Sequence, residues 1–343
     1  MKKALCFNDV LIAPKHWNGG SRSEVSLATN VAGINLDIPL ISANMASVTE
    51  TAMCIAIGKK GGLGILHRMC SIDEQVQMVL DAKRAGVKIG GCIGIDENAI
   101  SNAGKLIEAG CDLICIDVAF FAQDRAHEVA AQFRKLFDYF PLIVGNIATG
   151  VHVFQFEDFL SRKGIEPKNL AHKVGIGGSG VCSTRTQSGN GLPTFHSLMD
   201  ISEFYFSKSK SIIADGGHAT PGDCVKSLAM GAKTVMVGSL LAGTSATPGD
   251  IIVKDGKKYK EYFGNASSRA KIQAGLKNHN IEGIATIIPY KGATEDVIDN
   301  IVQGMKSGCT YSGAKNLKEL REKAEFVEIT TSGYKESTPY LGN

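Results

Sequence analysis

The chain has 343 residues, of which 44% are hydrophobic and 21% charged, and its formal net charge is +3. This charge is too small and too dispersed to indicate a nucleic-acid-binding protein, and no run of about 18 apolar residues predicts a membrane span. The first residues combine two lysines with a short apolar patch that Asp9 interrupts, so we expect no signal peptide.

Short runs rich in Ile, Val and Leu recur along the chain and predict buried β-strands. Their hydrophobicity is continuous rather than alternating, as expected of strands that are buried on both faces. In chain order they cover residues 38–42, 63–67, 88–94, 112–117, 141–146, 173–177, 211–215 and 233–238. Amphipathic stretches between them predict helices, and one of these begins with Ser71 as N-cap and Glu74 three residues later.

Strand–helix units repeated in this way predict an α/β fold, a closed (β/α)8 TIM barrel that forms one domain over residues 1–343. An open doubly wound sheet is the alternative, but no Gly-x-Gly-x-x-Gly motif follows the first strand. The polar segment over about 250–290 departs from the repeat, and we expect it to form a flap over one face. A carboxyl-terminal tail comes after it over about 328–343.

Polar residues and glycines follow most of the predicted strands, at the end where barrel enzymes place their active sites. In chain order these are Asn44 and Met45, His67 and Arg68, Asp117, Asn146, the loop around Cys182, Asp215 with Gly216 and Gly217, and Gly238 with Ser239. Such residues also cap helices, so each one alone is ambiguous. The glycines after the seventh and eighth strands favour a phosphate site, because they let the backbone approach an anion closely.

The sharpest feature is the segment GIGGSGVCSTRTQSGNG, residues 175–191, in which Cys182 lies among six glycines. The nine cysteines are scattered without a Cys-x-x-Cys pair, which predicts free thiols, mostly in the core, and a reducing cytoplasm. A thiol in a mobile glycine-rich loop has the access that a nucleophile needs. Thr184 could exchange a proton with it, and Arg185 could stabilise its anion or face solvent. The alternative is that Cys182 is an incidental loop residue.

Several segments between Phe7 and Ile329 together resemble the IMP dehydrogenase/GMP reductase family. They are FNDVLIAPKH, SRSEVSL, IPLISANMASVTE, GGLGILHR, GNIATG, GIGGSGVCSTR, IIADGGHATPGD, VMVGSLLAG and GAKNLKELREKAEFVEI. The resemblance implies that Cys182 attacks carbon 2 of the purine of a nucleoside monophosphate and forms a covalent adduct. It also implies a homotetramer.

The two branches of this family differ in the fate of the adduct. The dehydrogenase passes hydride to NAD and hydrolyses the adduct with a flap that carries an Arg-Tyr pair, whereas the reductase expels ammonia from GMP and accepts hydride from NADPH to give IMP. Between Tyr262 and Glu282 this chain has no such pair, since Ala270 follows Arg269, and KDGKKYKEYFGNASS resembles the reductase. We therefore expect NADPH-dependent reductive deamination of GMP, in which Thr184 and Glu282 protonate the departing ammonia.

Other segments resemble the dehydrogenase, among them GGLGILH and the ending FVEITTSGYKES. In that branch the ending lies beside a monovalent-cation site at the cysteine loop. Potassium bound at Gly177, Gly178 and Cys182 is therefore a further candidate.

Two departures from the family pattern concern the ligands. Ser179 and Gly180 are transposed relative to the family, in which the serine normally contacts the nucleotide phosphate. Phe120 and Phe121 follow the fourth strand, where a small polar residue and glycine are usual, and we expect them to alter the place of the nicotinamide ribose.

The resemblance implies two sets of binding residues. For the purine nucleotide they are Met45, Ser179, Asp215, Gly216, Gly217, Gly238, Ser239, Tyr262 and Gly264. For the nicotinamide cofactor they are Arg68, Asp117, Val118, Ala119, Asn146 and Arg185.

Three alternatives to the reductase stay open. The first is an NAD-dependent IMP dehydrogenase, which oxidises IMP to XMP. The second is a flavin-dependent barrel oxidoreductase with the same phosphate loops. The third is a nucleotide-binding paralogue that does not turn GMP over or that acts on a modified purine.

Overall fold

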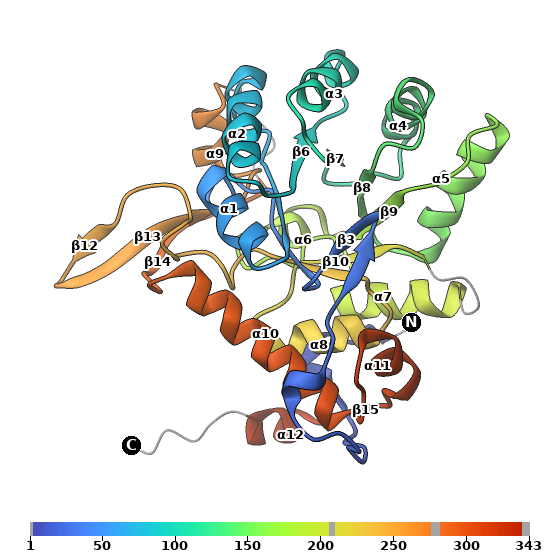
Figure 1. The fold of residues 1–343 in the computed structure, drawn as a ribbon, viewed down its shortest axis with the longest axis vertical. Coiled ribbons are helices and arrows are strands. Elements are labelled where there is room, and N and C mark those ends of the chain that lie inside the picture. The colour runs from blue at the N-terminus through green and yellow to red at the C-terminus, as the bar shows by residue number, and fades with distance from the viewer. Residues whose placement is uncertain (1–2, 206–209, 276–281, 338–343) are drawn as a thin grey trace.

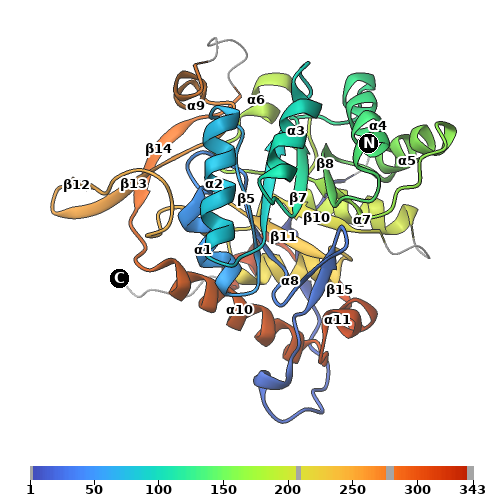
Figure 2. The ribbon, with the colours of Figure 1, turned by 45° about the horizontal axis from the view of Figure 1, so that its top comes forward.

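The computed structural model describes residues 3–205, 210–275 and 282–337, and its centre is a closed barrel of parallel strands. Helices surround this barrel (Figure 1), and a tilted view shows the strands inside them (Figure 2). Around the ring, in chain order, the strands are β4 (Leu40–Ser42), β5 (Leu63–Ile65), β6 (Ile89–Ile93), β7 (Leu113–Asp117), β8 (Leu142–Ile147), β9 (Leu170–Val174), β10 (Ile212–Asp215) and β11 (Thr234–Val237). The predicted (β/α)8 barrel is confirmed.

The outer layer consists of the longer helices that follow the barrel strands in the chain. They are α1 (Thr51–Lys59), α2 (Ile72–Arg84), α3 (Ala99–Glu108), α4 (Asp124–Phe137), α5 (Gly150–Arg162), α7 (Thr194–Phe204), α8 (Pro221–Ala229) and α10 (Thr294–Tyr311). The shorter helices are α6 (Thr184–Ser188), α9 (Ser268–Gln273), α11 (Leu317–Lys323) and α12 (Thr331–Glu336). The predicted capping box of α2 is present, since Ser71 accepts from the Glu74 N–H and Glu74 from the Ser71 N–H.

The predicted strands differ from the observed ones by at most two residues at either end, with one exception. The sixth was predicted at 173–177, but β9 covers Leu170–Val174, so that prediction is wrong by three residues. Two polar residues make β9 difficult to recognise in the sequence. His172 and Lys173 are each 2% exposed, and their partners are Glu157 and Asp117. Hydrophobicity does not identify a strand whose polar side chains are buried as pairs.

One end of the barrel is closed by a hairpin, which leaves the other end for a site. Strands β2 (Thr29–Val31) and β3 (Ile34–Leu36) pair antiparallel, and their apolar side chains pack with the side chains inside the barrel. Thr29 Oγ1 donates to the carbonyl of Lys233, just before β11 (2.8 Å). The hairpin therefore covers the end at which the strands begin.

In the polar segment predicted as a flap at 250–290, the described residues form a small antiparallel sheet and helix α9, and residues 276–281 of this prediction lie outside the described residues. The strands of the sheet are β12 (Ile252–Lys254), β13 (Lys257–Phe263) and β14 (Ala285–Pro289). The sheet projects from one side of the barrel in both ribbon views (Figures 1 and 2). In the tail, β15 (Phe326–Glu328) pairs antiparallel with β1 (Val10–Ile12), and α12 comes after it. The last part of the predicted tail, residues 338–343, lies outside the described residues.

The nine cysteines are free thiols, as predicted. Most are buried, including Cys115, whereas Cys6, Cys70 and Cys182 are half-buried. Burial raises the pKa of Cys309, in α10, to about 12, which keeps this thiol protonated. Cys182 differs from such core thiols in its partial exposure, which is the access that the sequence predicted for it.

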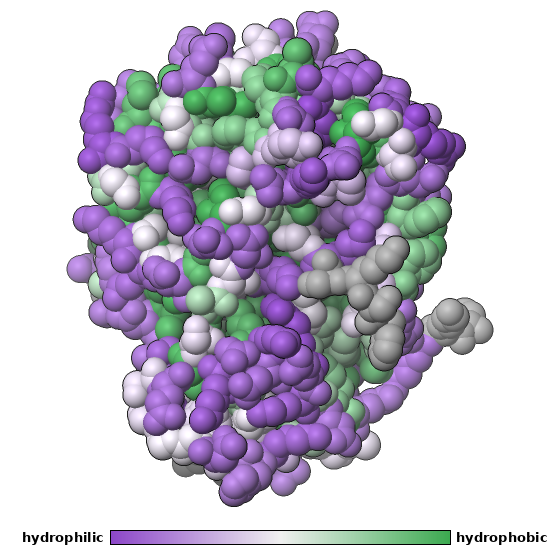
Figure 3. All heavy atoms as spheres, turned by 45° about the vertical axis from the view of Figure 1, so that its right-hand side comes forward, coloured by the Kyte–Doolittle hydropathy of each residue, from purple (hydrophilic) through white to green (hydrophobic). Residues whose placement is uncertain are grey.

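The surface is mixed in character. Figure 3 turns forward the side of the barrel that carries α5, α7 and α11, and hydrophilic residues gather on its lower part with apolar residues between them. None of the helices in the described part of the chain is long and apolar enough to cross a membrane.

Thr220 caps helix α8, which follows the loop after β10. Its Oγ1 accepts from the Asp223 N–H (3.2 Å), and the Asp223 carboxylate accepts in return from the Thr220 N–H (2.9 Å). We expect Thr220→Ala to lower the stability by about 1 kcal/mol. The variant loses the side-chain oxygen that accepts from the Asp223 N–H and the bond from the Thr220 hydroxyl to the Asp223 carboxylate (3.0 Å), and the Asp223 N–H keeps only its contact with the Thr220 carbonyl (3.2 Å). The midpoint of thermal unfolding measures this. Thr220→Ser keeps the hydroxyl and should behave as the wild type; an alanine variant with an unchanged midpoint would contradict the role of the cap.

Candidate active site

A cavity of about 340 Å³ lies at the end of the barrel where the strands finish. Residues from the loops after most of the barrel strands line it, together with residues of the segment between β13 and β14. From the predicted site these are Met45, Arg68, Asp117, Val118, Ala119, Asn146, Gly177, Gly178, Ser179, Cys182, Thr184, Asp215, Gly216, Gly264 and Glu282. The structure therefore places most of the predicted site residues around one cavity.

A smaller cavity of about 200 Å³ adjoins the first and shares Met45, Ser179, Asp215 and Gly216 with it. Its wall adds the glycine-rich loops after β10 and β11. From the predicted site these loops and β13 contribute Gly217, Gly238, Ser239 and Tyr262. The smaller cavity is therefore a chamber beside the larger one, and glycine-rich loops make up much of its wall.

The thiol of Cys182 begins a chain of hydrogen bonds. Its Sγ lies 3.1 Å from Oγ1 of Thr184, and this hydroxyl donates to Oε2 of Glu282 (2.7 Å). Thr184 and Glu282 are 98 residues apart in the sequence, so the fold alone brings them together. The arrangement can carry a proton between the carboxyl group and a molecule bound at the thiol.

Backbone pairing explains why Glu282 lies beside the cysteine loop. The Ser183 N–H donates to the carbonyl of Glu282 (2.9 Å), and the Ile284 N–H donates to the carbonyl of Val181 (3.0 Å). Cys182 and Gly283 therefore form an antiparallel bridge. The end of the flap segment thus holds the cysteine loop through its backbone as well as through the Thr184 side chain.

The cysteine loop depends on glycine where it leaves β9. Gly175 has a φ of +142°, and a Cβ at this position would lie 1.9 Å from the carbonyl oxygen of Asp215. A side chain here would push the loop away from β10.

Arg185 braces the loop rather than facing either cavity. Its Nε donates to the carbonyl of Ile176 (3.1 Å), and its Nη2 donates to the carbonyl of Leu192. Burial lowers the pKa of Arg185, and the Cys182 thiol partly opposes this. Arg185 lines neither of the two cavities, so the structure does not place this predicted cofactor ligand at the site.

Lys173 is a site residue that the sequence analysis missed. It is 2% exposed and lines the larger cavity, where its ammonium contacts Asp117 Oδ1 (2.8 Å) and Asp215 Oδ2 (3.0 Å). Asn146 accepts a hydrogen bond from Lys173 and donates one to Asp215 (2.8 Å). The available signal in the sequence was a lysine two residues before the glycine-rich loop, at the start of a predicted strand.

The charges of this cluster stabilise one another. Burial opposes ionisation of Asp117, but the positive charges of Lys173 and Arg68 outweigh it and lower the pKa of Asp117. Burial likewise opposes the charge on Lys173, but the carboxylates of Asp117 and Asp215 outweigh it and raise the pKa of Lys173. The cavity therefore holds one buried cation between two carboxylates.

Tyr262 lies in the wall of the smaller cavity. Burial raises the pKa of Tyr262, and a hydrogen bond with Ser179 partly opposes this shift. Ser179 therefore lines the chamber although its order with Gly180 is transposed relative to the family pattern. Both residues bring a hydroxyl group to the backbone-lined chamber.

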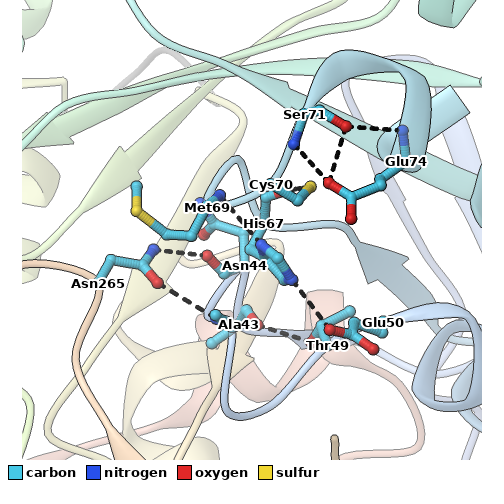
Figure 4. Close-up of polar contacts among 11 residues, drawn as sticks. Ala43, Asn44, Thr49, Glu50, His67, Met69, Cys70, Ser71, Glu74 and Asn265 are labelled. Atoms are coloured by element: carbon cyan, nitrogen blue, oxygen red, sulfur yellow. Dashed lines mark hydrogen bonds and ion pairs between the residues drawn. The ribbon is translucent and has the colours of Figure 1, made fainter. Parts of the chain in front are cut away.

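A network of side chains fixes the loops after β4 and β5 (Figure 4). The Met69 N–H donates to Nδ1 of His67 (3.0 Å), so the ring proton lies on Nε2, which faces Glu50 Oε1 at 3.3 Å. The side-chain amide of Asn265 donates to the carbonyl of Asn44 (2.8 Å), and its Oδ1 accepts from the Ala46 N–H in the same loop (3.2 Å). His67 and Asn265 thus position the loops that line the cavity, and the sequence analysis did not identify Asn265.

The two phenylalanines after β7 differ in their burial. Phe121 is fully buried and packs edge-on against Phe156, with ring centroids 5.0 Å apart. Phe120 is 42% exposed and packs against His152. The expectation that both rings alter the nicotinamide region does not hold for Phe121, because that ring belongs to the core.

Known proteins with similar sequences match nearly the whole chain. A family model described as "IMP dehydrogenase / GMP reductase domain" matches residues 4–340. An inosine-5′-monophosphate dehydrogenase from Aquifex aeolicus is 38% identical over 98% of this chain and 95% of that protein. GMP reductase 2 from Mus musculus is 33% identical over 95% of this chain and 94% of that protein.

A solved structure shares the fold. It is a GMP reductase variant from Trypanosoma brucei in complex with guanosine 5′-monophosphate, with a TM-score of 0.90, 23% identity and coverage of 100% of this chain and 99% of that chain. At this identity the likeness concerns the fold.

Proposed function

The chain belongs to the IMP dehydrogenase/GMP reductase family, and we propose that within this family it acts as a GMP reductase, which converts GMP and NADPH to IMP, ammonia and NADP. The observation that carries the proposal is the hydrogen-bonded chain of Cys182, Thr184 and Glu282 at one cavity. Loss of ammonia needs a proton donor beside the thiol, and this chain ends in a carboxyl group.

The proposed reaction begins with the thiolate of Cys182. Its sulfur adds to carbon 2 of the guanine ring, and the exocyclic amine takes up a proton through Thr184 from Glu282 and leaves as ammonia. The purine stays bound to sulfur. NADPH held by Arg68, Asp117 and Asn146 would supply a hydride to carbon 2, and cleavage of the carbon–sulfur bond would give IMP and return the electron pair to Cys182.

The residues of the larger cavity fit a nicotinamide cofactor. Arg68 lines this cavity, and its buried Nε has no hydrogen-bond partner in the described structure. Asp117 and Asn146 add an acceptor and an amide to the same wall. We propose that these residues hold the nicotinamide end, while Asp215 and the glycine loops hold the nucleotide ribose and phosphate.

IMP dehydrogenase is the second candidate function. The 38% identity to the Aquifex aeolicus dehydrogenase and the carboxyl-terminal segment that resembles this branch favour it. The reaction would need a base that activates water, and the Arg-Tyr pair is absent from the sequence between Tyr262 and Glu282. Potassium at the carbonyls of Gly177, Gly178 and Cys182, and a homotetramer, stay part of the proposal for either activity.

Paired assays distinguish the two activities. One mixture holds the protein, GMP and NADPH, and the other holds the protein, IMP, NAD and potassium. The reductase predicts turnover in the first mixture only, with and without potassium as a further comparison. Turnover in the second mixture only would establish the dehydrogenase, and nucleotide binding without turnover in either would establish a binding protein or a different purine substrate.

Glu282→Gln tests the proposed proton donor. Glutamine keeps the hydrogen bond from Thr184 but has no acidic proton, so we expect ammonia release from GMP to slow about 100-fold. Nucleotide affinity should change little, because glutamine has nearly the same shape and keeps the contact with Thr184. Glu261→Gln, at a partly exposed position of β13, is the matched control. A Glu282→Gln rate near that of the control would exclude Glu282 as the donor.

A further inference from the structure

A second large cavity lies at the opposite end of the barrel from Cys182. Its volume is about 780 Å³, within the range of small-molecule sites. The β2–β3 hairpin lines one side, and residues directly before β10 and β11, among them Ser211 and Lys233, line another. A cavity of about 630 Å³ adjoins it, and the two share Lys210, Lys233, Lys318 and Arg321.

Positive charge exceeds negative charge on these walls. The four shared cations face two carboxylates, Glu157 in the first cavity and Glu322 in the second. Glu157 pairs with Lys210, and Glu322 lies 3.8 Å from Lys318. Lys233 and Arg321 are therefore left without a carboxylate in the described part of the walls.

Lys233 and Arg321 form a half-buried pair of like charges. Arg321 is held by its Nη2, which donates to the carbonyl of Ala232 (3.0 Å), while its buried Nε has no partner among the described residues. Burial, together with the charge of Arg321, lowers the pKa of Lys233. Two cations held together in this way destabilise the fold unless an anion binds between them.

His172 supplies an independent observation. It lines the same cavity and is 2% exposed. Its Nε2 faces Glu157 Oε1 at 3.2 Å, whereas its buried Nδ1 has no partner in the residues that the structure describes. A buried polar atom without a partner is costly in a folded protein, so this wall of the cavity is incompletely satisfied in the described structure.

We propose that this cavity binds the phosphate group of a small phosphorylated metabolite, at a site separate from the catalytic pocket. Arginine and lysine together suit a phosphate, because guanidinium donates two parallel hydrogen bonds and ammonium adds a point charge. The volume leaves room for more than the phosphate alone. Such a ligand would bind the end of the barrel that the β2–β3 hairpin closes, and the site does not require that the protein reduce GMP.

Isothermal titration calorimetry with three probes tests the site. Orthophosphate, tripolyphosphate and GTP are titrated at constant ionic strength into the wild type, Lys233→Met and Lys135→Met, the last an exposed lysine of α4. We expect at least one probe to bind the wild type and Lys135→Met, and Lys233→Met to weaken that binding at least about tenfold. Tripolyphosphate binding would show that phosphate suffices, and binding of GTP alone that the nucleoside is also recognised.

Two results would overturn the proposal. One is that none of the probes binds, and the other is that Lys233→Met binds each probe as the wild type does, which would place the anion elsewhere, for example at the catalytic pocket. Thermal unfolding without ligand shows whether the variant is folded. Because methionine removes the repulsion from Arg321, the midpoint of Lys233→Met should equal or exceed that of the wild type; a clear decrease would mean that Lys233 has a stabilising partner and would also count against the site.

Discussion

Cys182→Ala is expected to lower turnover of GMP by at least about 10³-fold, because Cys182 is the only cysteine among the described residues that line the two active-site cavities. The half-buried thiol lines the cavity, and its hydrogen bond to Thr184 connects it to the acid. Alanine removes only the sulfur, so the variant should fold and still bind nucleotide. Initial rates of NADPH oxidation, with nucleotide binding measured separately, check both parts.

Cys70→Ala is the matched control for this variant. Cys70 is also half-buried, but it lies in the loop after β5 and lines neither active-site cavity. It should keep most of the activity. Residual turnover of Cys182→Ala within about tenfold of this control would contradict covalent catalysis, since an essential nucleophile contributes far more than that.

Lys173→Met is expected to destabilise the protein by about 3 kcal/mol at neutral pH, the lower end of the range for a broken buried ion pair. It leaves two half-buried carboxylates, Asp117 and Asp215, without the buried ammonium between them, and only the charge of Arg68 still favours ionised Asp117. The midpoint of thermal unfolding measures this, with Lys135→Met as the exposed control. Nucleotide affinity should fall as well, since Asp215 loses the contact that orients it.

The loss of stability in Lys173→Met should depend on pH, and its direction follows from the pKa of Asp117. In the wild type the pKa of Asp117 is lowered on folding, so its contribution to stability is full above the ordinary carboxyl pKa and is lost as pH falls through the lowered value. In Lys173→Met the carboxylate of Asp117 loses the positive charge that lowers its pKa and takes up a proton more readily. The difference in unfolding midpoint between the wild type and the variant should therefore shrink from pH 7 toward about pH 4. A difference that does not change over this range would contradict the ion-pair account.

The barrel could be predicted from the sequence because its strands are apolar runs of the right length between helices. β7 and β8, buried along most of their length, are examples. β9 was misplaced, because His172 and Lys173 make it look polar although each is buried with a partner from another element. Such pairs exist only in three dimensions, so the sequence alone cannot reveal them.

The residues of the site also differ in how far the sequence could predict them. Cys182 was predictable from its loop, since glycines around a lone thiol indicate access. The place of Glu282 beside Thr184 came from the family resemblance and not from spacing, because backbone pairing across the flap brings the two together. The sequence could not show whether Arg185 binds a cofactor or holds the loop. An arginine that donates to loop carbonyls has the same neighbours in the chain as one that binds a cofactor.

The most direct test of the central claim is the ratio of ammonia released to NADPH consumed, with GMP labelled by ¹⁵N at the exocyclic amine. The reductase account predicts one labelled ammonium for each NADPH oxidised, with IMP as the purine product and loss of both signals in Cys182→Ala. NADPH that stays unchanged with GMP, together with NAD reduction by IMP in the same preparation, would contradict it and identify the dehydrogenase.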